Sequence, residues 1–360
     1  MVVVGAGNIG SFLIAHLGRM AGLGSVTVID RDVYEAGNLA SQDIARRDVG
    51  RPKAVVQAHR LRRMHPALSV TAIVEAVERV PLAFLRGDVL LACLDSKTAR
   101  RSVNESTWRL GVPWIDAGVR GPELLARVNV YVPGPDQACL ECGWSAEHYA
   151  TLEAEYPCDG GQGGPGRTNS PSGLGALAAA LQALECQKLL AGDRAHVAVG
   201  SQVTISALAH RHYVTRLTVN PVCRFDHDVW RIEPLERRPE ELTVGRVFAL
   251  GRGATGGVDP LRLHVADQPF TTALVCPSCG RRRGVGLRLC GRIAPAAQRC
   301  ETCGRPMRAS GADMIEWLPE ADLPSAIRET SLRELGFHAG DVVTVAGTAG
   351  AAHFQIGEAS

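Results

Sequence analysis

Residues near the N-terminus have the types and the spacing of a nucleotide site. A glycine-rich turn contains Gly5, Gly7 and Gly10, and glycines let the backbone approach a phosphate group at the start of a helix. Asp30 follows after about 20 residues, the distance at which an acidic residue meets a ribose hydroxyl. Lys53, one of only three lysines among 39 basic residues, adds a compact charge suited to phosphate. Together these residues predict nucleotide binding.

The pattern around the turn indicates the elements that hold these residues. Residues 2–4 are an apolar run, and Leu13 and Leu17 recur after the turn at helical spacing. A second apolar run, 25–29, ends directly before Asp30. The order strand, tight turn, helix, strand predicts a Rossmann-like βαβ unit. The alternative is a structural glycine turn with an unrelated aspartate.

A further carboxylate stands after another apolar run. The run from Asp88 to Leu94 is typical of a parallel strand that is covered on both faces. Asp95 follows it, at the edge where open α/β sheets bind ligands. A carboxylate there suits a magnesium ion that bridges phosphate oxygens. The alternative is that Asp95 only caps a helix beginning near Lys97.

The polar residues after Asp30 favour ATP over a dinucleotide. A dehydrogenase holds its pyrophosphate mainly with backbone N–H groups. Three phosphates and a metal ion need more charge and more hydrogen bonds, and Asp32, Asn38 and Lys53 would supply them. The alternative for Lys53 is an ordinary surface lysine.

Six blocks of sequence resemble the ThiF/MoeB/HesA family of ubiquitin-activating-enzyme-like adenylyltransferases. They are VVVGAGNIGS, VIDRDVYEAGNLASQ, GRPKA, LACLDSKTAR, GVPWIDAGV and ALAAALQALECQKLLAG, spread over about residues 1–228. The resemblance implies a doubly wound α/β sheet, and the use of ATP and Mg²⁺ to adenylate the C-terminal carboxylate of a small ubiquitin-like or sulfur-carrier protein. It implies that Asp30 holds the ribose, Asn38 and Lys53 the phosphates, and Asp95 the magnesium ion. The expected nucleotide-binding residues are Gly5, Gly7, Asn8, Gly10, Asp30, Asp32, Asn38, Gln42, Lys53 and Asp95, and Lys53 and Asp95 are also expected to be catalytic.

Two departures from the family pattern concern the triphosphate. The family motif NLxRQ reads NLASQ from Asn38 onward, so Ser41 replaces an arginine. Arg46 or Arg47 would have to reach in from the following turn. Met1 directly precedes the first strand, so the family's N-terminal helices, which in relatives lend an arginine to the partner subunit, are missing from this sequence. Either the start site is misplaced, or this subgroup builds its triphosphate clamp differently.

The spacing of four cysteines near the C-terminus predicts a zinc site. Eleven cysteines in a chain with no secretion signal argue for metal more than for disulfides. Cys276, Cys279, Cys300 and Cys303 have the spacing of a zinc ribbon, whose closed set of four thiolates is structural. The alternative is four reduced structural cysteines.

The resemblance suggests a second zinc site, because relatives often pair two Cys-x-x-Cys knuckles in this part of the chain. Cys139 and Cys142 form one knuckle, and the other reads Cys223-Arg-Phe-Asp226-His227. Imidazole is a commoner partner of thiolates than carboxylate, so His227 is the expected fourth ligand. Asp226 would orient it or be an alternative ligand. The alternative interpretation is an empty site.

Cys290 lies in the middle of the ribbon and has no assigned role, and three further cysteines stand outside the ribbon and the other knuckles. Cys93 and Cys186 lie in apolar segments and are expected in the core. Cys158 lies in a glycine-rich stretch, where family members that form a thioester place their cysteine. Cys158 is therefore the expected catalytic acceptor, activated by Arg167 or by a helix N-terminus. An idle loop thiol is the alternative.

The remaining sequence suggests an accessory domain. A charged, proline-bearing linker over 229–243 is expected to join the adenylating domain, 1–228, to a small β-rich domain, 244–360, that contains the ribbon. Short strands are expected over 244–250, 261–265 and 271–275. Residues 281–308 carry eight Arg and one Glu, so the ribbon would bind an acidic carrier or, by electrostatics alone, nucleic acid.

Composition agrees with a cytoplasmic enzyme. The net charge of +2 gives no global attraction to nucleic acid or to a membrane. No apolar run approaches the ~20 residues of a membrane span, and the N-terminus has no signal segment. The apolar helix expected over 174–190 lies where relatives dimerise, which favours a homodimer.

The sequence thus predicts adenylation of a small carrier protein, followed in one version by transfer to a cysteine. Three alternatives remain open at this point. The acceptor is a peptide or a tRNA-linked carboxylate, the chain is a catalytically silent pseudo-subunit, or it is a dehydrogenase.

Overall fold

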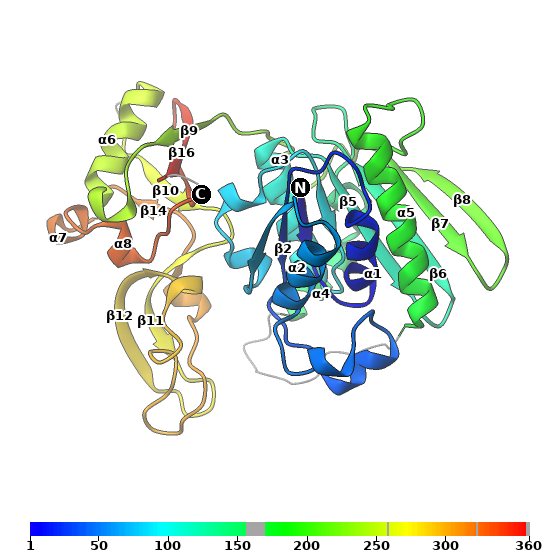
Figure 1. Ribbon diagram of the computed structural model, residues 1–360. Coiled ribbons are helices and arrows are strands. Elements are labelled where there is room, and N and C mark those ends of the chain that lie inside the picture. The colour runs from blue at the N-terminus through cyan, green and yellow to red at the C-terminus, as the bar shows by residue number, and fades with distance from the viewer. Residues whose placement is uncertain (156–169, 258, 322, 358–360) are drawn as a thin grey trace. The chain divides into compact units, whose positions relative to one another are not determined.

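The computed structural model describes residues 1–155, 170–257, 259–321 and 323–357 (Figure 1). The chain divides into two compact units. Unit 1 holds most of the chain up to Val229, and unit 2 holds the residues from Trp230 onward together with Arg79–Phe84. Cys158 and Arg167 lie outside the described residues.

An eight-stranded sheet forms the middle of unit 1. Its strands are β1 (Val2–Val4), β2 (Ser25–Ile29), β3 (Ser69–Ile73), β4 (Leu90–Ala92), β5 (Trp114–Arg120), β6 (Leu125–Tyr131), β7 (Ser201–Ser206) and β8 (Arg211–Arg216). Their order is β3-β2-β1-β4-β5-β6-β7-β8, with the first five parallel and the rest antiparallel. This doubly wound order confirms the expected Rossmann-like sheet and puts its switch point between β1 and β4.

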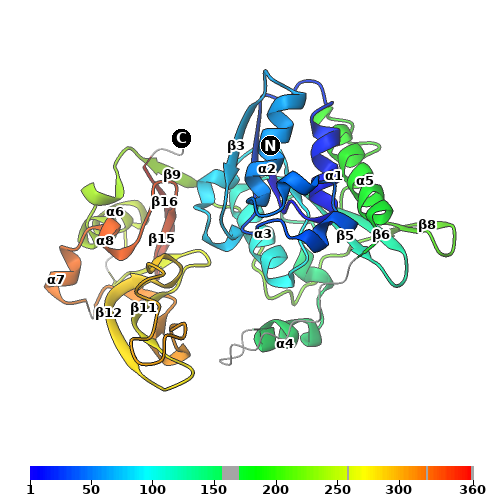
Figure 2. The same cartoon turned by 60° about the horizontal axis from the view of Figure 1, so that its bottom comes forward.

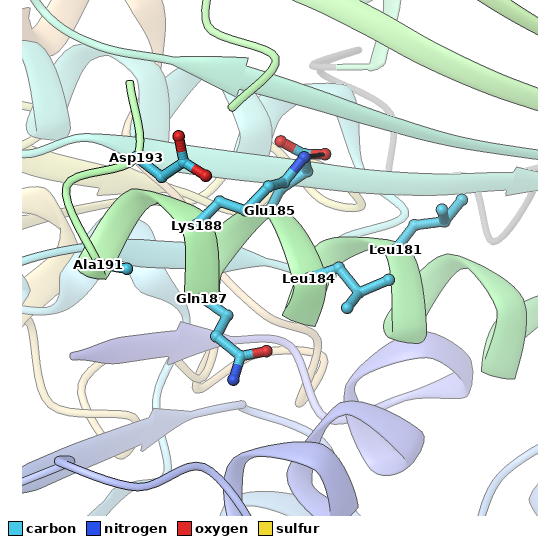
Figure 3. Close-up of a pocket in the computed structure, with 7 residues that line it drawn as sticks. All are labelled: Leu181, Leu184, Glu185, Gln187, Lys188, Ala191 and Asp193. Carbon is cyan, nitrogen blue, oxygen red and sulfur yellow. Dashed lines mark hydrogen bonds and ion pairs between the residues drawn. The ribbon is translucent and has the colours of Figure 1, made fainter. Parts of the chain in front are cut away.

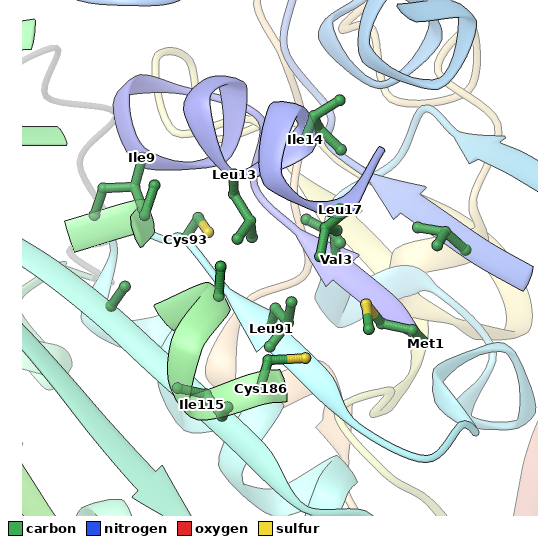
Figure 4. Packing of buried hydrophobic residues seen from close by; sticks show 14 of the residues in the cluster. Met1, Val3, Ile9, Leu13, Ile14, Leu17, Leu91, Cys93, Ile115 and Cys186 are labelled. Atoms are coloured by element: carbon green, nitrogen blue, oxygen red, sulfur yellow. The ribbon is translucent and has the colours of Figure 1, made fainter. Parts of the chain in front are cut away.

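The helices that pack onto this sheet are α1 (Asn8–Leu17), α2 (Lys53–Met64), α3 (Lys97–Leu110) and α5 (Ser172–Leu190). Helix α4 (Ala146–Glu155) also belongs to unit 1. α1 and α5 lie side by side (Figure 1). Leu17 of α1 packs with Val3 and Leu91 of the sheet, all fully buried (Figure 4). Cys93 and Cys186 lie in the same core, as their apolar surroundings predicted.

Unit 2 combines a larger and a smaller sheet (Figure 2). The larger sheet, in the order β14-β10-β15-β16-β9, contains β9 (Ile232–Leu235), β10 (Arg262–Val265), β14 (Leu318–Pro319), β15 (Val342–Gly347) and β16 (Gly350–Ile356). The smaller sheet, in the order β12-β11-β13, contains β11 (Phe270–Val275), β12 (Arg282–Leu289) and β13 (Met314–Ile315). The helices are α6 (Val244–Thr255), α7 (Ser325–Arg328) and α8 (Leu332–Leu335).

The strand expected over 244–250 is wrong, because these residues begin helix α6. The side chain of Thr243 accepts a hydrogen bond from the backbone N–H of Arg246 and so caps the helix, and Gly256 ends it in a left-handed conformation. Val244, Val247 and Phe248 are buried, at the spacing of one helical face. These cap signals were present in the sequence.

The segment expected as a linker, 229–243, contains strand β9. Ile232 and its neighbours pair in parallel with β16, and β9 is the edge of the larger sheet. An edge strand tolerates Pro234, because one side of it needs no ladder hydrogen bonds. Prolines and charges are therefore compatible with a strand here.

Among the described residues, no helix combines the length and the apolar character needed to cross a membrane.

Candidate functional site

The glycine turn between β1 and α1 is too closely packed for side chains at two of its positions. Gly5 has a φ of +92°, and a Cβ atom there would lie 2.4 Å from the carbonyl oxygen of Cys93. A Cβ atom at Gly10 would lie 2.0 Å from the carbonyl oxygen of Gly5. At Gly7, which precedes α1, a Cβ atom would meet nothing within 4 Å. The open side of the turn therefore lies at the N-terminus of α1, where an anion binds well.

The carboxylate of Asp30 holds this turn in place. Its Oδ2 accepts a hydrogen bond from the backbone N–H of Ala6 at 2.6 Å, and its Oδ1 accepts one from the N–H of Asp32 at 2.8 Å. Burial raises the pKa of Asp30, and these two hydrogen bonds oppose the shift. A carboxylate has about four acceptor sites, so Asp30 can still accept a hydrogen bond from a ribose hydroxyl.

Two residues that sequence reasoning missed complete the support of the turn. The hydroxyl of Tyr34 donates to the carbonyl oxygen of Ala6 at 2.7 Å, and Gln57 of α2 donates to that hydroxyl at 2.8 Å. Tyr34 is fully buried, and burial raises its pKa. Nothing in the local sequence pattern singles out either residue, because their partners are more than 20 residues away.

Lys53 is the first residue of α2, and it is only 7% exposed. Its Nζ lies 3.0 Å from Oδ2 of Asp32, whose side chain is 43% exposed. The backbone N–H of Lys53 also donates to the carbonyl oxygen of Asp32 at 2.8 Å. The two residues that were expected to serve the nucleotide thus form an ion pair with each other.

Asn38 and Gln42 lie on and after a short 3₁₀ helix, Ala36–Ala40. The side-chain oxygen of Asn38 accepts a hydrogen bond from the N–H of Glu35 at 2.9 Å, which closes the start of that helix. The side-chain oxygen of Gln42 is buried and has no hydrogen-bond partner among the described residues. Asn38 is therefore held by the fold, whereas Gln42 keeps an unused acceptor.

The arginine that Ser41 replaces has no substitute at Arg46 or Arg47. Ser41 is 5% exposed, while Arg46 and Arg47 are exposed. Neither arginine side chain forms a hydrogen bond or ion pair with a described residue. Arg60 of α2 does reach this region, because its Nη1 donates to the carbonyl oxygen of Asp43 at 2.8 Å. Sequence reasoning did not single out Arg60.

Asp95 follows β4 and is exposed, at the carboxyl end of the strand next to β1. Helix α3 is capped by Ser96, whose side chain accepts a hydrogen bond from the N–H of Ala99 at 3.3 Å. Asp95 itself forms no hydrogen bond or ion pair within the described ranges. Its carboxylate is consequently not committed to capping and fits the oxygen ligand that magnesium prefers.

A buried ion cluster next to Asp95 was missed from the sequence. The carboxylate of Asp116, on β5, is fully buried between Nε of Arg100 at 2.8 Å and Nη1 of Arg127 at 2.8 Å. Arg100 also donates to the carbonyl oxygen of Leu94. Asp116 raises the pKa of Arg127. An aspartate within an apolar strand is the signal that should have suggested buried partners.

The structure brings Cys139, Cys142, Cys223 and His227 together, with ligand atoms within 4.8 Å of one another. Nε2 of His227 lies 3.1 Å from Sγ of Cys139 and 3.4 Å from Sγ of Cys142. Asp226 points elsewhere, because Nη2 of Arg109 donates to it at 2.9 Å. Burial lowers the pKa of His227, although Asp226 opposes the shift, and a lowered pKa favours the neutral imidazole that binds zinc.

The four cysteines of unit 2, Cys276, Cys279, Cys300 and Cys303, form a second cluster, whose Sγ atoms also lie within 4.8 Å of one another. Both knuckles read Cys-x-x-Cys-Gly-Arg, and Gly280 and Gly304 each adopt a positive φ, of +71° and +68°. Hydrogen bonds from backbone N–H groups, first that of Cys303, lower the pKa of Cys300 to about 6. Such hydrogen bonds favour the thiolate form that zinc requires. Cys290 has no place in the cluster, and burial raises its pKa to about 11.

A pocket of about 400 Å³ lies on the outer side of α5 (Figure 3). Its lining includes Leu181, Leu184 and the ion pair between Glu185 and Lys188. None of the residues expected to bind the nucleotide lines it. The pocket is therefore separate from the site at the strand ends.

Comparison with known proteins gives consistent relatives for unit 1. The model of the ThiF family matches residues 1–224. Over 196 residues the chain is 30% identical to the sulfur carrier protein ThiS adenylyltransferase of Escherichia coli (strain K12), covering 53% of this chain and 72% of the relative. Over 227 residues it is 27% identical to the molybdopterin-synthase adenylyltransferase of the same organism, covering 62% and 85%.

Other matches cover less of the relative. The chain is 31% identical to the NEDD8-activating enzyme E1 catalytic subunit of Saccharomyces cerevisiae, over 39% of this chain and 50% of that protein. Among solved structures, that of E. coli MccB with ATP aligns with a TM-score of 0.50 and 23% identity, over 62% of this chain and 65% of MccB, which supports the fold alone. The chain therefore belongs to the ThiF family, and its named relatives put it in the enzyme class of adenylyltransferases and E1-like activating enzymes.

Proposed function

We propose that this protein uses ATP and Mg²⁺ to adenylate the C-terminal carboxylate of a small ubiquitin-like or sulfur-carrier protein. The observation that carries the proposal is the convergence of three features at the carboxyl ends of adjacent parallel strands. These are the open glycine turn after β1, Asp30 and Lys53 after β2, and the uncommitted Asp95 after β4.

Each group has a role in this proposal. Asp30 accepts a hydrogen bond from the ribose, and Lys53, with Asn38, binds the phosphates. Asp95 would hold the magnesium ion, which supplies charge neutralisation for the departing pyrophosphate. The acceptor carboxylate attacks the α-phosphate, so the protein supplies position and charge and no nucleophile for this step.

Exchange of labelled pyrophosphate into ATP tests the proposal. Small β-grasp proteins ending in Gly-Gly from the same genome would be offered as acceptors. We expect acceptor-dependent exchange that falls at least 100-fold in Asp95→Asn, as expected when a metal ligand in the transition state is lost. Asp88→Asn is the matched control, since Asp88 is an exposed carboxylate before the other end of β4.

Other results would favour the alternatives. ATP binding without exchange for any acceptor would indicate a pseudo-subunit, for which the loss of an arginine at Ser41 is the specific observation. Exchange with a peptide or a tRNA-linked carboxylate would change the acceptor class. Binding of NADH without ATP would indicate a dehydrogenase.

Transfer to a cysteine is a separate part of the proposal. Cys158 would be the acceptor thiol, and it lies outside the described residues. If it is, Cys158→Ala retains pyrophosphate exchange and loses the covalent carrier adduct on a non-reducing gel; an unchanged adduct would contradict the assignment.

We further propose a cytoplasmic homodimer with two structural zinc ions in each chain. The outer face of α5 supports the dimer, because Leu184 and Leu190 are 56% and 39% exposed there. Leu184→Glu is expected to halve the mass measured by light scattering, and an unchanged mass would contradict this interface.

A further inference from the structure

Arg127 reaches from β6 across β5 toward Asp116. In the register of the two strands Arg127 is the partner of Gly118. A Cβ atom at Gly118 would lie 3.0 Å from Nε and 3.0 Å from Nη2 of Arg127. The absence of a side chain at Gly118 therefore creates the space in which the guanidinium lies.

Among the described residues, Nη1 is the one nitrogen atom of this guanidinium that forms hydrogen bonds. Nη1 donates to Oδ2 of Asp116 at 2.8 Å and to Oδ1 of Asn129 at 3.0 Å. In the described part of the chain, neither Nε nor Nη2 donates a hydrogen bond, and the side chain is 28% exposed. Nε and Nη2 form the edge of an arginine that binds a carboxylate through two parallel hydrogen bonds.

The net charge of the cluster also favours the binding of an anion. Asp116 is the one carboxylate shared by Arg100 and Arg127, so the three residues carry a net charge of +1. Arg100 is mostly buried, with a side-chain exposure of 14%, and its Nη2 is occupied by the carbonyl oxygen of Leu94. The positive charge that Asp116 does not balance is consequently located at Arg127, where it can attract an anion.

Arg127 lies on the side of Asp95 that is away from the glycine turn. Asp116 pairs with Ala92 of β4 in the strand register. Two residues further along, Gly118 and its partner Arg127 therefore lie beside Leu94, the residue before Asp95. In the strand order, β6 lies two places beyond β4, on the side away from β1 and β2. The guanidinium of Arg127 lies over Gly118 of β5, so it is about one strand spacing, ~4.8 Å, from β4 and farther from the glycine turn. Under the proposed function, the group that approaches from this side is the acceptor.

We propose that Nε and Nη2 of Arg127 bind a carboxylate of the acceptor, so that Arg127 selects acceptors that present an acidic group. The inference rests on the proposed function and names a recognition residue for it. The carboxylate is either the C-terminal one or that of an acidic side chain close to the terminus. Both sources offer the same pair of oxygens, and different peptides distinguish them.

Fluorescence anisotropy with labelled peptides of about ten residues ending in Gly-Gly tests the proposal. One peptide has a free C-terminal carboxylate and no acidic side chain, one is its C-terminal amide, and one is the amide with a single Glu near the end. Wild-type protein is expected to bind at least one carboxylate-bearing peptide about tenfold more tightly than the neutral amide, the range of a charge-assisted pair of hydrogen bonds. Which peptide gains identifies the source.

In Arg127→Ala this tenfold preference is expected to fall to about one, while binding of the neutral amide stays within twofold. A merely structural role would weaken all peptides equally. Arg127→Lys keeps the positive charge but not the pair of parallel N–H donors, and it is expected to retain only part of the preference. Gly118→Ala crowds Nε and Nη2 without removing them, so it is expected to reduce the preference, and it serves if Arg127→Ala fails to fold. Arg211→Ala, a charge loss on exposed strand β8, is the control that should keep the preference.

A preference unchanged in both Arg127→Ala and Gly118→Ala would overturn the proposal, and so would a wild-type protein that shows no preference for a carboxylate. ATP binding, measured separately by calorimetry, is expected to be the same in Arg127→Ala and wild type. A wild-type protein that binds no ATP would contradict the proposed function but leave the peptide measurement as an independent result.

Discussion

The ammonium group of Lys53 lies 3.0 Å from the carboxylate of Asp32, and this pair links the start of α2 to the segment after β2. Lys53 is almost completely buried, whereas Asp32 is half exposed. A buried ammonium needs a counter-charge or a set of acceptors. Asp32 provides this counter-charge, and under the proposed function a phosphate group would provide it once ATP binds.

Replacing Lys53 with alanine tests whether its ammonium group binds a phosphate of the nucleotide. Lys53→Ala should weaken binding of Mg-ATP by roughly tenfold or more, because a charge-assisted contact to phosphate is lost. Calorimetry measures this affinity directly. Arg47→Ala, the loss of an exposed charge in a nearby turn, should leave the affinity within twofold. Equal affinities for wild type and Lys53→Ala would show that Lys53 does not contact the nucleotide.

Asp32→Asn should affect the nucleotide-free protein most. It leaves the ammonium of Lys53 without its counter-charge, so the free energy of unfolding should fall by about 1–3 kcal/mol. Mg-ATP should restore much of this loss, because phosphate replaces the missing carboxylate. Urea unfolding with and without Mg-ATP gives both values, and a loss that ATP does not reduce would argue against the exchange of partners.

The glycines of the turn should respond differently to alanine. Gly10→Ala places a methyl group 2.0 Å from a carbonyl oxygen and should cost several kcal/mol or prevent folding. Gly7→Ala meets open space, so its melting temperature should change little. Its affinity for ATP should nevertheless fall, because the methyl group occupies the approach to the phosphate. Unchanged ATP affinity in Gly7→Ala would place the phosphate elsewhere.

Zinc content distinguishes the residues of the cluster in unit 1. Mass spectrometry of the purified wild-type protein should find about two zinc ions per chain, one for each cluster. His227→Ala should lose about one, while Asp226→Asn should keep both, because Asp226 contacts Arg109 and not the cluster. Loss of zinc in Asp226→Asn but not in His227→Ala would reverse the ligand assignment.

Stability should depend on Asp341, whose pKa burial raises to about 6 although Arg292 opposes the shift. The unfolded carboxyl ionises near its ordinary value of 3.8, so between pH 4 and 6 the folded state holds the extra proton. This contribution is therefore largest below pH 4, and it is lost as the pH rises to 6. The difference between the pKa values of the unfolded and folded states corresponds to roughly 3 kcal/mol.

Asp341→Asn isolates this effect from that of His338, which donates its backbone N–H to Asp341. Burial lowers the pKa of His338, which gives the opposite slope below pH 6.5. The free energy of unfolding of both proteins is measured in urea at pH 4.5 and 7. We expect the wild type to lose stability relative to Asp341→Asn as the pH rises. A constant difference would mean that Asp341 is ionised throughout.

Local patterns were sufficient where the information lies within one short stretch of chain. The strands at residues 2–4 and 25–29 were predicted with the observed bounds, because their apolar runs end at glycine and aspartate. The same kind of information was misapplied at α6, where Thr243 and Gly256 mark a helix that was taken for a strand.

Other features depend on how distant segments meet. Cys139 and Cys223 lie 84 positions apart, and their sulfur atoms are 3.8 Å from each other only because β6, β7 and β8 pair as they do. The choice between Asp226 and His227 likewise depends on Arg109 of α3. No spacing rule contains such a contact.

The sequence by itself determined the βαβ order, the glycine turn with Asp30, and the two cysteine knuckles of unit 2, since each depends on residues that are near in the chain or on a regular period. Only the tertiary structure decided that Lys53 pairs with Asp32, that Asp95 stays uncommitted because Ser96 caps α3, and that Arg127 lies over Gly118 beside Asp116. These relations follow from strand register and helix packing, in which a shift of one residue turns a side chain to the opposite face.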